Sequence, residues 1–252
     1  MTAAPLARVA LALVVLVAVA LVVLTVARVH VRRDAIVAVA RAAVQLTLVA
    51  LVIAWVFLHP GGVVLYLAVM LTAAAWTSTG RIGLGVGVLP VALLAIAAGA
   101  VSATGPVLAS GALPLRAETV VPFAAQIIGG SMTATSLTGI RLRDDVAAGW
   151  DAVEGWLAIG ATPRQAVVPQ ARRAVARALV PALDQTRSAG LVVLPGAFVG
   201  LLLGGASPAE AAQVQLLVLV GLLAAESVAS VVTARLLADR VGVVRPSVGA
   251  RD

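Results

Sequence analysis

The amino-acid sequence predicts an all-α protein that crosses a membrane several times, because its composition and its apolar runs both require lipid. Of the 252 residues, 62% are hydrophobic and only 12% are charged, whereas a soluble domain of this length is about half apolar and a quarter charged. So few charges would not keep the surface of a soluble protein hydrated. The many valines do not predict strands, because an open sheet leaves backbone N–H and C=O groups unpaired in lipid.

Seven apolar segments are long enough, or nearly so, to cross about 30 Å of hydrocarbon, which takes about 20 helical residues. The first is longer than the core of a signal peptide and is followed by basic residues rather than a cleavage site, so we expect it to be retained. The sixth contains Pro181 and Pro195. The predicted segments are 6–28, 36–58, 62–78, 84–102, 119–140, 177–203 and 211–235.

The arginines predict the orientation, because the cytoplasmic loops of membrane proteins carry an excess of positive charge. With the N-terminus outside, only Arg8 and Arg116 fall in external segments, while Arg41 lies just inside the second segment near its cytoplasmic end. The sequence therefore predicts a bacterial inner-membrane protein with seven crossings, its N-terminus outside and its C-terminus in the cytoplasm. We expect one transmembrane permease domain over residues 1–252.

Several classes of function are excluded by absent motifs. The chain has no cysteine, which excludes disulfides and zinc–thiolate sites. Its two histidines, His30 and His59, lie at opposite membrane ends, so no HExxH site exists. The glycines at 83–87 lack the Lys-Ser/Thr ending of a Walker A loop. The net charge is +7, but the arginines flank apolar runs and only 3% of the residues are aromatic. This pattern argues against a nucleic-acid partner. We expect no catalytic site and no cofactor bound by this chain.

One large cytoplasmic connection is expected, at residues 141–176, the only stretch with a soluble composition. We therefore expect any partner protein to bind there. An amphipathic helix is predicted at about 150–159. Its apolar face would hold Trp150, Val153, Trp156 and Leu157.

A tight turn is predicted to follow this helix. Gly160 would supply a left-handed C-cap, and Thr162 an N-cap with Pro163 at the first helical position. Gln165 would complete a capping box with Thr162, and Pro169 would end or kink the second helix. Such an exposed helix–turn–helix would either bind a partner or lie on the anionic leaflet of the membrane.

Two sets of residues resemble known permeases. Glu154 stands six positions before Gly160, as an acidic residue and a glycine do in the coupling loop of ABC-transporter permeases. Over about residues 35–240 the chain is similar to the Fet-type iron-export permease family, which includes plant aluminium-tolerance permeases. The matching positions, in order, are Arg41, Gln45, Gly160–Ala166, Pro181–Asp184, Gly190–Gly196, Gly200, Pro208 and Gln215.

This resemblance implies a permease subunit that exports metal ions and forms a homodimer. A separate cytoplasmic ABC ATP-binding subunit would hold ATP and Mg²⁺. The chain departs from the family where Ala197 and Phe198 replace methionines, so a path of soft sulfur ligands is less expected and the metal ligands stay unassigned. The residues expected to contact the ATP-binding subunit are Glu154, Trp156, Gly160, Ala161, Thr162, Pro163 and Arg164.

The transport path is predicted from polar and helix-breaking residues in the membrane segments. Glu226 lies well inside the last segment, where an ionisable group is costly and is a default functional candidate; it would bind a cation, relay a proton, or be a neutral structural group. Pro195 and Gly196 would break the sixth segment. The whole predicted path comprises Arg41, Gln45, Gln126, Met132, Pro195, Gly196 and Glu226. The alternative interpretation is a partner-free secondary transporter or membrane scaffold.

Overall fold

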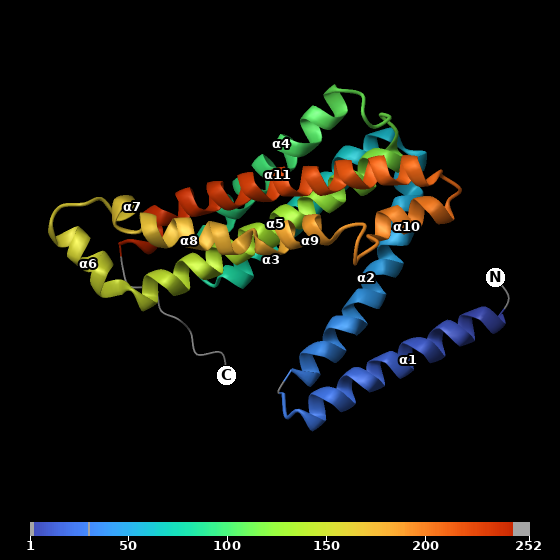
Figure 1. Ribbon diagram of the computed structural model, residues 1–252, viewed down its shortest axis with the longest axis horizontal. Coiled ribbons are helices and arrows are strands. Elements are labelled where there is room, and N and C mark those ends of the chain that lie inside the picture. Colours follow the sequence, from blue (N-terminus) through green and yellow to red (C-terminus); the bar gives the residue numbers. More distant parts are fainter. Residues whose placement is uncertain (1–2, 30, 244–252) are drawn as a thin grey trace. The chain divides into compact units, whose positions relative to one another are not determined.

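The computed structural model describes residues 3–29 and 31–243. Most of these residues are helical, and the described part of the chain has no β-strand, only an isolated bridge between Ala189 and Val193. Six helical stretches within it are long and apolar enough to cross a membrane (Figure 1). These stretches are Ala7–Val26, Arg32–Leu58, Gly61–Ile82, Val86–Ala109, Ala117–Ala148 and Pro208–Val241. The prediction of a multi-pass, all-α membrane protein is confirmed.

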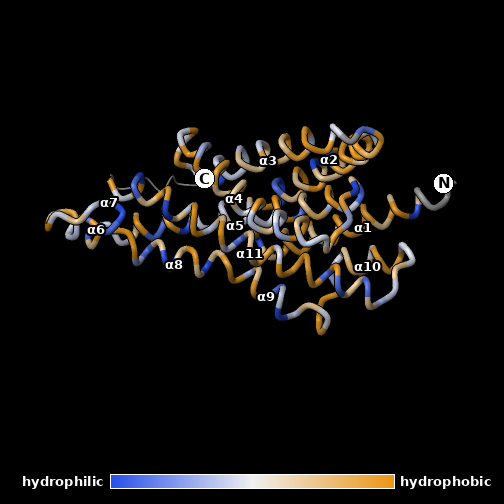
Figure 2. The backbone as a smooth tube through the Cα atoms, turned by 90° about the horizontal axis from the view of Figure 1, so that it is seen from above, coloured by the Kyte–Doolittle hydropathy of each residue, from blue (hydrophilic) through white to orange (hydrophobic). Residues whose placement is uncertain are grey.

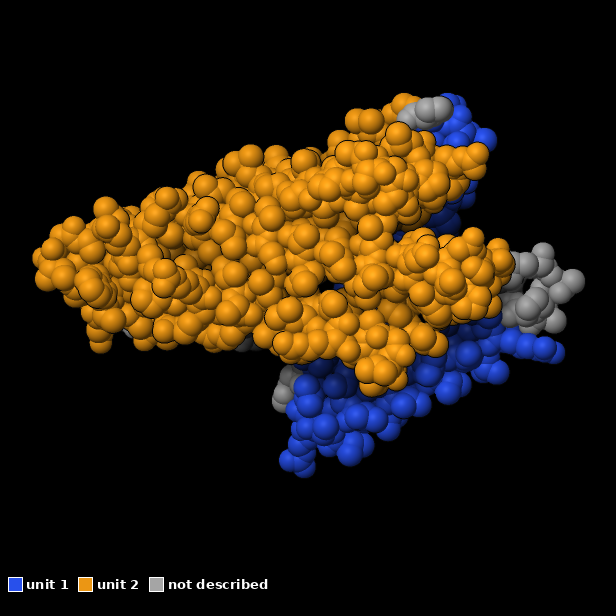
Figure 3. Space-filling view, turned by 45° about the horizontal axis from the view of Figure 1, so that its top comes forward, with its two compact units in different colours: residues 1–59 blue, residues 60–252 orange. Residues whose placement is uncertain are grey.

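The chain divides into two compact units, residues 1–59 and 60–252, which Figure 3 colours separately. The first unit consists of α1 (Ala3–Val26) and α2 (Arg32–Leu58), which contact each other. Nearly all of the described side chains of both helices are exposed. Large apolar residues lie on every side of α1, so this helix needs an apolar surrounding such as lipid.

The second unit is built around four long helices: α3 (Pro60–Ile82), α4 (Leu89–Ala109), α5 (Ala117–Ala148) and α11 (Pro208–Val241). α4, α5 and α11 pack against one another, and α3 packs on α4 and α5. Small residues allow this close approach, as is typical of membrane helices. Gly99 of α4 is the clearest case, because a Cβ atom there would lie 2.6 Å from the Ala225 carbonyl oxygen of α11.

The remaining helices are short. They are η1 (Val86–Val88), α6 (Trp150–Ala158), α7 (Pro163–Ala166), α8 (Val168–Ala178), α9 (Val180–Ser188) and α10 (Gly196–Leu203). Each helix from α7 to α10 contacts α11, so this part of the chain follows α11 along its length (Figure 1). Figure 2 shows hydrophilic positions recurring along α7 and α8, whereas α10 is hydrophobic throughout.

The sixth predicted segment, 177–203, is not a single membrane-spanning helix, and the chain breaks before Gly196 as expected. α8 ends at Ala178, and α9 starts at Val180 with Pro181 in its first turn. The chain then leaves the helical conformation after Ser188, and Pro195 is the N-cap residue of α10. Proline is accepted in a first turn, where the N–H has no helical partner, but it breaks a helix interior.

The two central helices are longer than predicted. α5 runs to Ala148 rather than to about residue 140, and α11 to Val241 rather than 235. At 1.5 Å per residue α5 is about 48 Å long, well beyond the hydrocarbon thickness. The predicted cytoplasmic connection therefore begins as the last two turns of α5, which carry Arg141 and Arg143.

Candidate functional site

The turn between α6 and α7, residues 159–162, has the predicted backbone conformation. Gly160 has φ +91°, a value that L side chains rarely adopt. The Gly160 N–H donates to the Leu157 carbonyl at 3.0 Å, and the Ala161 N–H donates to the Trp156 carbonyl at 3.0 Å. This pair of bonds is the Schellman motif. Since a Cβ atom at Gly160 would meet nothing within 4 Å, the backbone conformation, rather than lack of space, requires glycine.

The start of α7 also has the predicted cap. The Thr162 hydroxyl accepts a hydrogen bond from the Gln165 backbone N–H at 3.3 Å, and the Gln165 side-chain oxygen accepts one from the Thr162 N–H at 2.8 Å. Pro163 occupies the first turn, α7 ends at Ala166, and Pro169 lies in the first turn of α8. The predicted helix–turn–helix is confirmed, and we call α6, the turn and α7 the docking element.

The docking element is anchored in an apolar core that it shares with the long helices. Val153 of α6 and Ala166 of α7 are both fully buried, as is Val167 between α7 and α8. They belong to one cluster with Leu142 of α5 and Leu237 of α11. Because protein cores are close-packed, a displacement of the docking element must displace the ends of α5 and α11 with it.

Arg164 and Pro163 attach α7 directly to the end of α11. An Arg164 guanidinium nitrogen donates to the Arg235 carbonyl oxygen at 3.0 Å and lies 3.3 Å from the Asp239 carboxylate. A Cβ atom at Gly242, the C-cap residue of α11, would lie 2.6 Å from the Pro163 carbonyl oxygen. The docking element is therefore held on α11 both by polar contacts and by close backbone approach.

The outer surface of the docking element carries two large exposed apolar side chains. Trp156 is 53% exposed and Ile159 is 75% exposed. With Gly160, Ala161 and Gln165 they line a hollow of about 460 Å³. Exposed aromatic and aliphatic side chains on a fixed turn are typical of the central anchors of protein–protein interfaces.

One residue of the predicted apolar face does not pack against the core. Trp150 and Leu157 pack against the core around Val153, but Trp156 is exposed. At 100° per residue, positions 150, 153 and 157 share one side of a helix and position 156 lies off it. Glu154 is also exposed, so both Trp156 and Glu154 are accessible to a partner.

Arg143 and Arg240 hold the turn between α3 and α4. From the sequence, these arginines were used only to predict the orientation in the membrane. Arg143 of α5 is 7% exposed, donates to the Ile82 carbonyl oxygen at 2.5 Å, and pairs with Asp144 at 2.7 Å. Arg240 of α11 donates to the Gly87 carbonyl oxygen. The ends of α3 and α4 are thus tied to the same ends of α5 and α11 that hold the docking element. No local sequence signal identifies these pairings, which span 61 and 153 residues.

A row of buried polar side chains runs along the contact between α5 and α11. We call it the polar seam, and it consists of Ser131, Thr135 and Thr138 on α5 and Glu226, Ser230 and Thr233 on α11. The Thr233 hydroxyl donates to the Thr135 hydroxyl at 3.4 Å. The hydroxyl groups of Ser131, Thr138 and Ser230 have no hydrogen-bond partner among the described residues. Buried polar atoms are usually satisfied, so these three unpaired oxygens mark the seam as an exception in the packing of the helices.

Glu226 is placed against a glycine of α5. Its side chain is buried, and a Cβ atom at Gly130 would lie 2.7 Å from its Oε1 atom. Within the part of the chain described here, Glu226 has neither a salt bridge nor a hydrogen bond. The carboxyl group thus occupies space that only glycine leaves open.

The other predicted path residues do not join Glu226 in the seam. Gln126 is exposed on α5, whereas Ile127 and Ser131 of the same helix are buried. Met132 packs in an apolar cluster between α3, α4 and α5. Arg41 and Gln45 lie on α2 in the first unit, where both are exposed. Sequence reasoning missed the serines and threonines, which are common in membrane helices.

Pro195 lies at a cavity, as its helix-breaking role suggests. Gly190, with φ +81°, and the bridge between Ala189 and Val193 form the break before α10. The break and α11 enclose a cavity of about 400 Å³ that Pro195, Phe198 and Gln215 line. The Gln215 side-chain oxygen is buried there without a partner among the described residues. Gly196 starts α10 beside it.

No resident metal site is evident in the described residues, where no three His, Cys, Asp or Glu side chains gather closely enough to hold a metal ion. The seam oxygens are hydroxyl and carboxyl groups, which suit hard cations rather than soft ones. The arrangement is a row of buried polar groups between packed helices, with one acidic residue in it.

Comparison with known proteins gives one consistent family. Residues 6–241 match the family described as "Uncharacterised protein family (UPF0014)". The chain is 35% identical to the UPF0014 membrane protein STAR2 of Oryza sativa subsp. japonica, over 82% of this chain and 73% of the relative. It is 34% identical to Protein ALUMINUM SENSITIVE 3 of Arabidopsis thaliana, over 79% and 73%.

A bacterial relative carries a transport name. The chain is 30% identical to the "Probable iron export permease protein FetB" of Escherichia coli (strain K12), over 81% of this chain and 80% of the relative. No solved structure matches this chain significantly. The apolar helices and the bacterial relatives together support a multi-pass protein of the bacterial inner membrane.

Proposed function

The chain belongs to the UPF0014 family of membrane permeases, and from this premise we propose that it is the membrane subunit of an ABC transporter. A separate cytoplasmic subunit binds and hydrolyses ATP with Mg²⁺, and this chain provides the path through the membrane. The transporter is a homodimer of this chain, so that each copy offers one docking element to one ATP-binding subunit.

The observation that carries the proposal is the docking element itself. It combines a fixed turn at Gly160, an apolar outer surface around Trp156, and a buried anchor at Val153. A segment that merely lay on lipid would need the outer surface but not the anchor. Contact on one side and core packing on the other are what a force-transmitting element requires.

The path of the force follows from the shared core. When the ATP-binding subunits close on ATP, they move the docking element, and its core cluster moves the ends of α5 and α11. The polar seam lies between these two helices, so a small change in their separation alters access to Glu226. Arg143 and Arg240 carry the same displacement to the turn between α3 and α4.

The proposed cargo is a metal ion, moved outward. The name of the E. coli relative refers to iron export and that of the Arabidopsis relative to aluminium. Oxygen donors in the seam suit such hard cations. A carboxyl group in a membrane interior is costly unless it serves a function, and Glu226 is the acidic residue in the seam.

The test is the binding of ATP-binding subunits to the full chain in mild detergent. Trp156→Ala and Ile159→Ala are combined, because both side chains are exposed and their loss leaves the core intact. Removing two anchors of an interface should cost at least about 2 kcal/mol, or roughly thirtyfold in affinity. The control is Leu115→Ala, which removes a 77% exposed side chain from the segment between α4 and α5.

Titration of candidate Walker-type subunits against the immobilised permease measures the affinity. Loss of binding in the double variant alone supports the proposal. If the wild-type chain binds no such subunit, or the double variant and the control bind equally well, the docking element is not a coupling site. The partner-free secondary transporter then becomes the better interpretation.

A further inference from the structure

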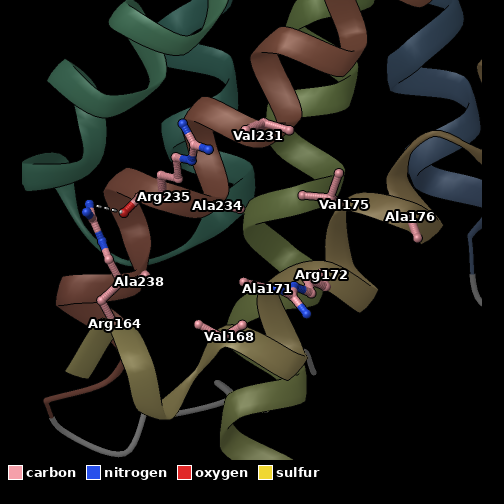
Figure 4. A pocket seen from close by; sticks show the side chains of 10 residues that line it. All are labelled: Arg164, Val168, Ala171, Arg172, Val175, Ala176, Val231, Ala234, Arg235 and Ala238. Atoms are coloured by element: carbon pink, nitrogen blue, oxygen red, sulfur yellow. Dashed lines mark hydrogen bonds between the residues drawn. The ribbon is translucent and has the colours of Figure 1, made fainter. Parts of the chain in front are cut away.

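A hollow of about 490 Å³ lies between α8 and α11, beside the docking element (Figure 4). Its floor is aliphatic and comes from both helices. The floor residues include Val168, Ala171 and Val175 of α8 and Val231, Ala234 and Ala238 of α11. On each helix these positions follow the spacing i, i+3, i+7 and therefore share one face. Two apolar stripes thus face each other across the hollow.

Three arginines line the same hollow: Arg164, Arg172 and Arg235. Arg164 is engaged, since it binds the Arg235 carbonyl oxygen and Asp239 (Figure 4). The guanidinium groups of Arg172 and Arg235 have no hydrogen-bond or salt-bridge partner in the described chain. Arg177 of the same helix α8 differs, because it pairs with Asp145 at 2.5 Å. The hollow therefore combines an apolar floor with two guanidinium groups that no internal carboxylate neutralises.

The place of the hollow along α11 indicates its surroundings. Arg235 follows the apolar stretch of this helix, and the arginine distribution predicts that this end faces the cytoplasm. The mouth of the hollow then lies at the level of the lipid head groups of the inner leaflet. Basic pockets between helices at this level are suited to anionic lipid head groups.

We propose that this hollow binds an anionic phospholipid of the inner leaflet. The positive charges of Arg172 and Arg235, on the two sides of the hollow (Figure 4), attract the anionic head group, and the aliphatic floor between α8 and α11 takes the start of an acyl chain. A free phosphate ion would use the arginines but leave the floor uncovered, which favours a lipid. The site does not depend on an ATP-binding partner, and a lipid bound there would contact Arg164 of the docking element.

The experiment is native mass spectrometry of the purified full-length chain with added phosphatidylglycerol or phosphatidylcholine. Wild type should bind phosphatidylglycerol in preference to phosphatidylcholine. Each arginine near a membrane surface contributes about 1 kcal/mol, which is about fivefold, so Arg172→Gln with Arg235→Gln should reduce this preference by about 25-fold. Arg173→Gln is the matched control, because Arg173 is an exposed arginine of α8 that does not line the hollow.

A second variant tests the floor without changing charge. Val175→Phe places a larger side chain in the hollow and should weaken phosphatidylglycerol binding, while circular dichroism shows the fold retained. Retention of the lipid preference in the double arginine variant, an equal loss in Arg173→Gln, or an unchanged affinity in Val175→Phe would each overturn the proposal. Displacement of the lipid by equimolar inorganic phosphate would also overturn it, since the site would then be one for free anions.

Discussion

The docking element packs on the ends of α5 and α11, and the polar seam lies between these two helices, but the two regions are specified in opposite ways. In the docking element, neighbours in sequence fix the conformation: Gly160 takes the positive φ and Thr162 exchanges hydrogen bonds with Gln165. In the seam, Ser131 and Glu226 acquire their surroundings only when α4, α5 and α11 pack together. Local chain chemistry therefore shapes the element proposed to bind the partner, whereas helix packing creates the seam proposed to bind the cargo.

The largest expected effect tests the packing that creates the seam. At Gly99→Ala the new Cβ atom would lie 2.6 Å from both the Ala225 carbonyl oxygen and the Ser131 hydroxyl oxygen. A backbone carbonyl cannot move aside as a flexible side chain can, so we expect a loss of about 1–3 kcal/mol in the free energy of unfolding. Unfolding by SDS, followed by circular dichroism, measures it.

Gly105→Ala is the matched control, because Gly105 lies on the same helix α4 with nothing within 4 Å of its Cβ position. Alanine there should leave stability unchanged or raise it by up to about 1 kcal/mol. Equal destabilisation by both variants would show that close packing at Gly99 does not hold the seam together.

Loss of a helix N-cap should affect ATP hydrolysis only where the helix belongs to the docking element. Thr162→Ala and Ser207→Ala each remove the N-cap of a complete capping box, at the start of α7 and of α11 respectively. Each should cost about 1 kcal/mol of stability. We expect only Thr162→Ala to lower ATP hydrolysis stimulated by the permease, because α7 belongs to the proposed contact with the ATP-binding subunit and the start of α11 does not. ATPase assays of the reconstituted complex measure this difference, and an equal decrease in both variants would mean that general destabilisation explains it.

The contrast between the two regions also explains what the sequence predicts well. The residues that determine the turn lie within six positions of one another, so the turn could be predicted in detail. They are Gly160, Thr162, Pro163 and Gln165. The side of α5 that packs against the other helices could not be predicted, since the lipid-facing side of a membrane helix is as apolar as its packed side. Gln126 was therefore placed inside although it is exposed.

The break at 189–195 shows a second limit of sequence reasoning. Pro195 and Gly196 were expected to break the sixth segment, but the apolar run over 177–203 still predicted that the segment crosses the membrane. Membrane helices tolerate proline when neighbouring groups satisfy the freed backbone, so the sequence does not distinguish a kink from an end. Here the Gly190 N–H donates to the Val193 carbonyl oxygen at 3.0 Å, which closes a turn instead of continuing the helix.

The smallest expected effect on stability is that of Glu226→Gln. The replacement keeps the shape of a side chain that forms no ion pair or hydrogen bond with any described residue, so stability should change less than in the Gly99→Ala or Thr162→Ala variant. Glutamine cannot carry a negative charge or release a proton, so metal transport into inverted vesicles should fall if the seam is the path. The control is Glu118→Gln, in the first turn of α5, which should transport as wild type does.

The Glu226 result decides which part of the molecule the cargo meets. A stable Glu226→Gln variant that binds its ATP-binding subunit but does not transport would place the cargo in the seam, because the docking element would be intact and only the carboxyl group altered. Normal transport by the same variant would direct attention to the cavity at Pro195, where Gln215 offers the buried oxygen that the seam would then not provide. Helix packing produces both sites. Transport by the Glu226→Gln variant therefore decides between the Glu226 carboxyl group in the seam and the Gln215 amide at the cavity.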